Sequence, residues 1–95
     1  MQIKDLQPKQ GKVEIEAEII EIGIVREFQK FGKIGRVANA TIKDDTGQMN
    51  LTLWNDEIDK VTAGKKIKIV NGYVNEWQGE KQLTAGRFGE IHIVN

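Results

Sequence analysis

The sequence contains no cysteine and one histidine, His92, among its 95 residues. Disulfide bridges, thiolate metal sites and cysteine nucleophiles are therefore excluded, and a lone histidine without a second such ligand does not anchor a transition metal. No apolar run approaches the length of a membrane span, and the N-terminus lacks the apolar segment of a secretory signal. These absences predict an intracellular, cytoplasmic domain that contacts no membrane and holds no metal or other cofactor.

Net charge is also absent, because 14 basic residues balance 14 acidic residues. A neutral domain does not act as a general polycation. The charges are nevertheless uneven: residues 26–43 carry five cations against Glu27 alone, whereas acids gather in 14–21 and again in 44–59. Such a surface either steers a polyanion to one groove or consists of solvated strands joined by salt bridges.

A chain of 95 residues predicts one domain over 1–95, with room for one core. Alternating apolar residues indicate a first strand over 12–25, whose phase shifts after Ile19 and so predicts a bulge or sharp bend. Residues 26–35 contain two glycines and are expected to form a loop. A second strand, 36–43, then joins the third, 48–54, through the turn 44–47 as a hairpin.

The third strand places an indole where water is expected. Met49, Leu51 and Leu53 alternate with polar residues, so Trp54 falls on the polar face. An exposed indole offers a stacking surface for planar partners such as nucleobases. The alternative is that a loop or a terminus covers this side chain.

After the third strand the period changes to that of a short helix. Asn55 or Asp56 is expected to cap it, and Gly64 to end it. A fourth strand then breaks its phase at 71–72, and a fifth, 81–94, is interrupted at its glycines. The outward residues of the fourth strand's second half are Tyr73, Asn75 and Trp77.

This order predicts an all-β fold, a five-stranded OB-fold barrel of Greek-key topology with a capping helix between strands three and four. Such barrels bind ligands on strands two and three and on the loops that join strands one to two and four to five. Cations and polar groups of this sequence fall there. The expected phosphate contacts are Lys30, Lys33, Arg36 and Arg87. The expected polar contacts to bases or sugars, unless these groups are only solvated, are Asn39, Thr41, Asn50, Thr52 and Gln82.

Three further aromatic residues have two interpretations each. Phe28 and Phe31 either fold onto a ligand, or one of them packs under the rim of the barrel. Tyr73 either stacks on a base or is a core tyrosine with a satisfied hydroxyl. A fourth, Phe88, is expected to be structural.

Residues 44–54 (DDTGQMNLTLW) and 71–87 (NGYVNEWQGEKQLTAGR) resemble the single-stranded DNA-binding proteins of the simple archaeal type and the single OB domains of archaeal replication protein A. The resemblance implies largely sequence-independent binding of single-stranded DNA in replication, repair and recombination, near the nucleoid. It also implies further OB domains or replication and repair proteins as partners. The long tail of the simple proteins is missing after Asn95, so we expect either a core domain of something larger or a member without a tail. The stacking aromatics of the family map onto Trp54, Tyr73 and Trp77.

Other classes of function have less support. The acidic pair Asp44–Asp45 belongs to a turn, and no nucleophile, general base or Gly-rich phosphate loop appears, so we expect no enzyme. A protein-interaction OB domain would use Trp54 and Trp77 as interface anchors. RNA, including tRNA, would fit the same face of the same fold.

Overall fold

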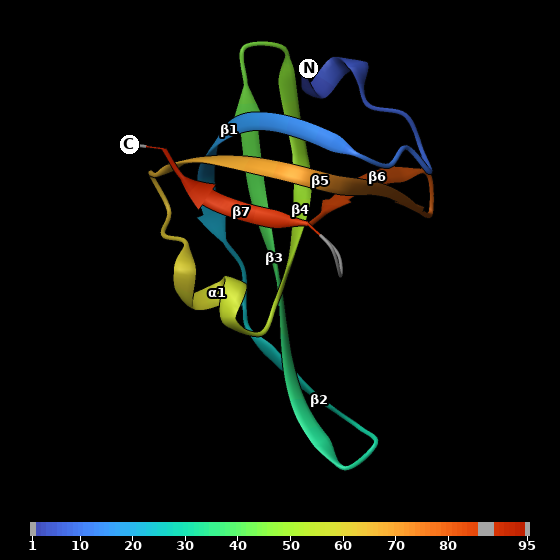
Figure 1. Ribbon diagram of the computed structural model, residues 1–95, viewed down its shortest axis with the longest axis vertical. Helices are drawn as coiled ribbons and strands as arrows, with labels where there is room; N and C mark the ends of the chain where they lie inside the picture. The colour runs from blue at the N-terminus through green and yellow to red at the C-terminus, as the bar shows by residue number, and fades with distance from the viewer. Residues whose placement is uncertain (1, 86–88, 95) are drawn as a thin grey trace.

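The computed structural model describes residues 2–85 and 89–94, without the side chain of Trp77. Over these residues the strands join into one closed sheet in the order β1-β3-β4-β6-β5, because β1 also pairs with β5 (Figure 1). β2 extends the sheet beside β3, and β7 pairs with β5. The elements are η1 (Ile3–Asp5), β1 (Val13–Ile22), β2 (Arg26–Lys30), β3 (Lys33–Asp44), β4 (Gly47–Trp54), α1 (Asp56–Lys60), β5 (Lys66–Trp77), β6 (Glu80–Thr84) and β7 (Glu90–Ile93).

The predicted all-β OB fold is confirmed, with β1, β3, β4, β5 and the pair β6–β7 as its five strands. The strand pairs are antiparallel except β4 with β6, which is parallel and helps to close the sheet. β6 and β7 both pair with β5, at residues 73–77 and 67–70 respectively, as expected for one interrupted strand. Of the two interrupting glycines, Gly86 lies outside the described residues, and Gly89 directly precedes β7.

Both predicted breaks of phase are bulges. In β1, Ile19 pairs with Ile42 and Glu21 with Thr41, so Ile20 is an extra residue. In β5, the bulge lies between Ile69, which pairs with Ile15, and Gly72, which pairs with Val13. Bulges bend and twist a strand, which lets β1 and β5 each serve two sides of the closed sheet.

The buried core of the described residues is entirely aliphatic. From Ala38 to Ile42 in β3 and from Leu51 to Leu53 in β4, every second residue points into it, as predicted, and Met49 packs against its edge. Aliphatic side chains fill the closed sheet, so the aromatic side chains that the structure describes lie at the surface. The inward residues of these two strands are Ala38, Ala40, Ile42, Leu51 and Leu53.

The turn between β3 and β4 is tied to the N-terminal segment by Asp44. Its carboxylate accepts hydrogen bonds from the backbone N–H of Ile3 at 2.8 Å and of Thr46 at 2.7 Å, and from the Thr46 hydroxyl at 2.6 Å. Partial burial raises the pKa of Asp44, but the hydrogen bonds from Thr46 and Ile3 outweigh it and hold that pKa below the usual range.

Helix α1 differs from the prediction at both ends. It ends at Lys60 rather than Gly64, because Val61 is already extended and is buried together with Ile58. Asn55 occupies the cap position, one of the two predicted, but its side chain makes no capping hydrogen bond.

Residues 26–35, predicted to be a loop, form most of a β-hairpin instead. β2 pairs with β3 from Arg26 with Val37 to Lys30 with Lys33, and the hairpin extends beyond the closed sheet (Figure 1). Its turn residues, Phe31 and Gly32, have φ angles of 53° and 74°, as a two-residue type I′ turn requires. The first strand accordingly ends at Ile22 and not at residue 25.

Candidate nucleic-acid interface

Four neighbouring strands, β3, β4, β6 and β5, present their outward side chains as one surface. Register aligns these side chains in two rows that cross the strands, and the pairing is unbroken within each row. Four of the five predicted polar contacts are half-buried, and Asn39 is exposed. The structure therefore brings all five together. The two rows, which we call the polar face, are Asn39, Thr52, Thr84 and Tyr73, and Thr41, Asn50, Gln82 and Asn75.

Trp54 lies at one end of the polar face, where it pairs with Val37. The residue is 42% exposed, so the predicted outward position is confirmed and the alternative of a covered indole is not. Tyr73 is 39% exposed and is not a core residue. Counted in strand spacings, Tyr73 lies roughly 10 Å across the sheet from Thr52, and Trp54 lies about 7 Å along β4 from it. An extended ligand crossing this surface meets both rings.

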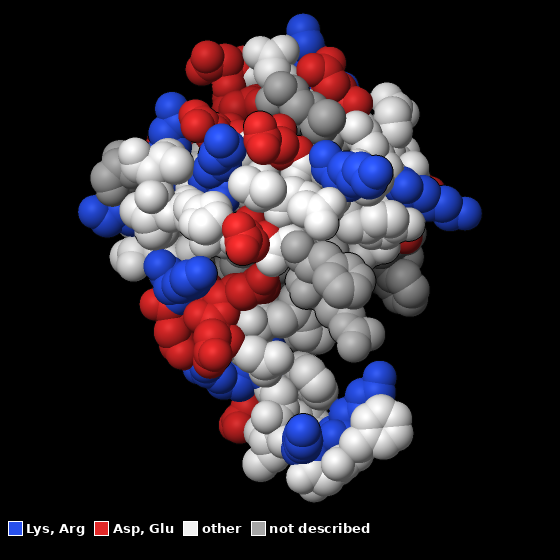
Figure 2. Space-filling model, viewed as in Figure 1, with Lys and Arg blue, Asp and Glu red and all other residues white. Residues whose placement is uncertain are grey.

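The β2–β3 hairpin continues the same surface beyond Trp54. Its pairs place Phe28 and Gly35 on the side of the sheet to which Trp54 belongs, together with Lys30 and Lys33. Lys and Arg side chains gather at the hairpin tip, apart from the acidic groups over α1 (Figure 2). Arg26 shares this side and was not among the predicted contacts. Its alternation with Phe28 and Lys30 was the available signal, and it was missed because the segment was expected to be a loop.

The two phenylalanines of the hairpin have different environments. Phe28 is half-buried, and its ring meets the Trp54 ring edge-on, with 5.8 Å between the centroids and 83° between the planes. It also covers Gly35, where an added Cβ would lie 2.3 Å from the Phe28 ring. Phe31 at the turn is 92% exposed, with the Lys30 ammonium 5.5 Å from its ring centre. Phe28 thus supports Trp54, and Phe31 is open to solvent.

Arg36 does not share this side of β3. Alternation along the unbroken β3 ladder turns it away from Lys33 and Val37, toward α1. There its guanidinium binds the carboxylate of Asp59 at 2.7 Å and 3.3 Å. The hydrogen bond and charge of Asp59 raise the pKa of Arg36, and Arg36 lowers the pKa of Asp59 in the same way. The predicted grouping of Arg36 with the hairpin lysines was therefore wrong in geometry.

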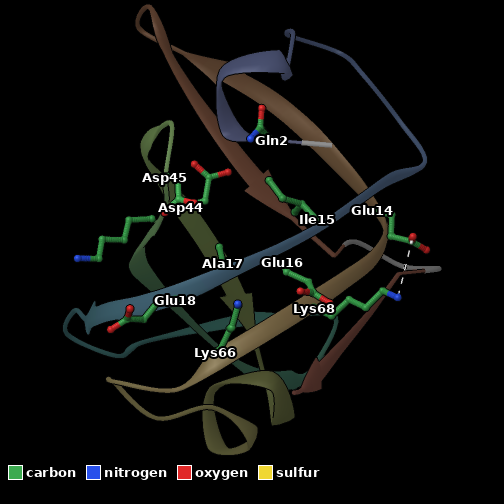
Figure 3. Close-up of a pocket in the computed structure, with 11 residues that line it drawn as sticks. Gln2, Glu14, Ile15, Glu16, Ala17, Glu18, Asp44, Asp45, Lys66 and Lys68 are labelled. Carbon is green, nitrogen blue, oxygen red and sulfur yellow. Dashed lines mark ion pairs between the residues drawn. The ribbon is translucent and has the colours of Figure 1, made fainter. Parts of the chain in front are cut away.

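A second surface, on the outer side of β1 and the first half of β5, is of mixed charge. Glutamates of β1 face lysines of β5 there, and the Glu14 carboxylate lies 4.0 Å from the Lys68 ammonium (Figure 3). Of the two interpretations of the uneven charges, solvated strands joined by salt bridges is the one that describes this surface. Its acids outnumber its cations in the hollow that they line, so it repels a polyanion. The acids and cations of the hollow are Glu14, Glu16, Glu18, Asp44, Asp45, Lys43, Lys66 and Lys68.

Some predicted positions are not described. Arg87 and Phe88 lie outside the described residues. The backbone of Trp77 pairs with Glu80, and nothing follows for its ring. Within residues 2–85 and 89–94, no group of three or more His, Cys, Asp or Glu side chains could hold a metal ion. The helix α1 is far too short to cross a membrane.

Comparison with known proteins shows the family to which this chain belongs. The family model of the OB-fold nucleic acid binding domain matches residues 13–91. A single-stranded DNA binding protein of Saccharolobus solfataricus is 27% identical over 88% of this chain and 57% of its own length. A replication factor A of Methanothermobacter thermautotrophicus is 35% identical over 73% of this chain and 9% of its own.

Among solved structures, a domain of replication protein A from Methanococcus maripaludis covers all of this chain and 94% of its own. Its TM-score is 0.82 and its identity 29%. The chain spans little more than half of one curated relative and a small part of the other. The resemblance predicted from the sequence is confirmed. This chain belongs to the family of OB-fold nucleic acid binding domains and is homologous to archaeal single-stranded DNA-binding protein and replication factor A.

Proposed function

We propose that this domain binds single-stranded DNA along the polar face and the β2–β3 hairpin, largely independently of sequence. The observation that carries the proposal is the position of Trp54. It is a large exposed ring at the junction of a polar sheet and a cationic hairpin, in a fold whose described core is aliphatic. The names of the curated relatives, a single-stranded DNA binding protein and a replication factor, support the same ligand.

Each part of the surface has a physical role in this proposal. Bases stack on Trp54, Tyr73 and Trp77, and stacking on such rings contributes about 1 to 3 kcal/mol per base without selecting a sequence. Lys30, Lys33 and Arg26 neutralise phosphates, as would Arg87. Phe31 adds an exposed ring at the hairpin tip. The polar face supplies donors and acceptors for sugars and base edges.

The proposal extends to the setting in which the domain works. We propose binding without catalysis, in replication, repair or recombination, and the name of one relative, a replication factor, supports the first of these settings. Because this chain is similar to only part of each curated relative, further OB domains or replication proteins are proposed as partners. An intracellular, nucleoid-associated location follows from the same ligand.

Anisotropy titrations with labelled strands test the proposal. Wild-type protein is titrated with single-stranded DNA, RNA of the same sequence and duplex DNA. Trp54→Ala should weaken binding to the single strand by about 1 to 3 kcal/mol. His92→Ala is the control, because it removes an exposed ring from β7, outside the polar face and the hairpin. Preference for RNA, equal binding of duplex, or an unchanged affinity of Trp54→Ala would contradict the proposal.

A further inference from the structure

We propose that Arg36 is a positioning residue for Trp54, which it holds ready for stacking from the opposite face of β3, without contacting DNA. This inference rests on the proposed function and deepens it. It concerns the turn that follows Trp54, between β4 and α1. The side chains that fix this turn are Arg36, Asn55, Glu57 and Asp59.

Asn55 continues the β3–β4 ladder one residue past Trp54 with its side chain. The backbone N–H of Arg36 donates to the Asn55 side-chain oxygen at 2.9 Å, and the Asn55 N–H donates to the Arg36 carbonyl at 2.9 Å. The amide oxygen of Asn55 thus takes the place of a strand carbonyl. Asn55 itself has φ 53° and ψ −119°, a conformation that a side chain disfavours and that surrounding contacts must hold.

The Arg36 guanidinium supplies those contacts. It donates to the backbone carbonyl of Asn55 at 3.3 Å while it binds Asp59 of α1. One side chain therefore bridges the strained residue and the helix that follows it. The planar fork of arginine suits two acceptors at once, which the single ammonium of lysine does not reproduce.

Trp54 is held from the helix side as well. Its backbone N–H donates to the half-buried Glu57 carboxylate at 2.9 Å. Burial raises the pKa of Glu57, against the opposing effects of this hydrogen bond and of Lys60. With Asn55 fixed after it and Phe28 beside its ring, Trp54 has little freedom to move before a base arrives.

Preorganisation of Trp54 should have a measurable effect on the affinity for a single strand. Ordering a side chain on binding costs about 0.5 to 1.5 kcal/mol, and about 1.4 kcal/mol corresponds to a tenfold change in affinity. Loss of the Arg36 contacts should therefore weaken single-strand binding by about 2- to 12-fold. Since Arg36 touches no phosphate in this proposal, the dependence of affinity on salt should not change.

The test measures single-strand affinity from low to moderate salt for Arg36→Ala, Arg36→Lys and Asp59→Ala. All three should weaken binding with the salt slope unchanged. If Arg36 instead contacted a phosphate, the opposite pattern is expected. Arg36→Ala would flatten the slope of log affinity against log salt by about 0.7, Arg36→Lys would retain most of the affinity, and Asp59→Ala would strengthen binding. That pattern would overturn the proposal. Lys68→Ala, which breaks the ion pair with Glu14 on the other surface, is the matched control.

Two further measurements separate positioning from general stability. In a Trp54→Ala background, Arg36→Ala should have no further effect on affinity, whereas a further loss there would refute action through Trp54. Fluorine NMR of protein labelled with fluorotryptophan should show a shifted or broadened Trp54 resonance in Arg36→Ala, with the Trp77 resonance unchanged. An unperturbed Trp54 resonance would also refute the proposal. The NMR arm needs no DNA, so it remains informative if the wild-type protein fails to bind a single strand.

Discussion

Substituting Gly35 by alanine should disturb the support of Trp54 without touching Trp54. An added Cβ would lie 2.3 to 2.8 Å from three carbons of the Phe28 ring, far inside van der Waals contact. The backbone of Gly35 does not have a positive φ, so alanine fits the local conformation and the clash is the only obstacle. Phe28 must therefore leave its place on Gly35, and its edge-on contact with Trp54 is lost.

The expected change in stability is a difference of two opposing contributions. Loss of an edge-to-face aromatic pair costs about 0.5 to 1.5 kcal/mol. Replacing glycine by alanine in a strand stabilises by roughly 0.5 to 1 kcal/mol. The net loss in the free energy of unfolding should thus stay below about 1 kcal/mol. Single-strand affinity should fall by about 2- to 12-fold, because Trp54 becomes mobile before binding.

A double-mutant cycle with Phe28→Ala gives the decisive comparison. In the Phe28→Ala background there is no ring to displace, so Gly35→Ala should stabilise the protein by about 0.5 to 1 kcal/mol. Urea unfolding of the four proteins measures the stabilities, and anisotropy titration measures the affinities. The same effect of Gly35→Ala in both backgrounds would show that Gly35 and Phe28 are not coupled, and the reasoning would fail.

Three other outcomes are expected. The double change Lys30→Ala with Lys33→Ala should flatten the slope of log affinity against log salt by about 1.4, since each lost phosphate contact removes roughly 0.7. The control pair, Lys66→Ala with Lys68→Ala, should leave the slope unchanged. Equal slopes for both pairs would place the DNA elsewhere. Asp44→Asn should destabilise by about 1 to 2 kcal/mol at neutral pH through its lost hydrogen bonds. Because the pKa of Asp44 is lowered in the fold, that contribution exists above the usual aspartate pKa of about 3.9 and is lost as pH falls below it. The melting temperatures of wild type and Asp44→Asn should therefore converge as pH falls, and a constant difference between them would refute this role of the carboxylate. Unlabelled duplex should compete far more weakly than a single strand of equal length for a labelled single strand.

Local pattern was sufficient to assign the inward and outward faces of the strands in the closed sheet. Strict alternation assigned Leu51 and Leu53 to the core and Trp54 to the surface, because successive side chains of a strand point to opposite faces. The phase shift after Ile19 located a bulge for a related reason, since one extra residue reverses that alternation. These features depend on near neighbours in the chain, and a single sequence reports them.

Contacts between distant segments were beyond such reasoning. The two glycines of residues 26–35 read as a loop, but one lies in a hairpin turn and the other beneath Phe28, and only the pairing of β2 with β3 distinguishes these uses. Arg36 was grouped with nearby lysines by charge, although the alternation that includes Ala38 already put it on the other face of β3, and only folding brought it to Asp59, 23 residues later. The alternation in the sequence alone determined which strand residues point into the core and assigned the rings of Trp54 and Tyr73 to outward faces of their strands. Tertiary structure decided which of those rings are supported and which cations are free for phosphate, because both depend on groups that only folding brings together.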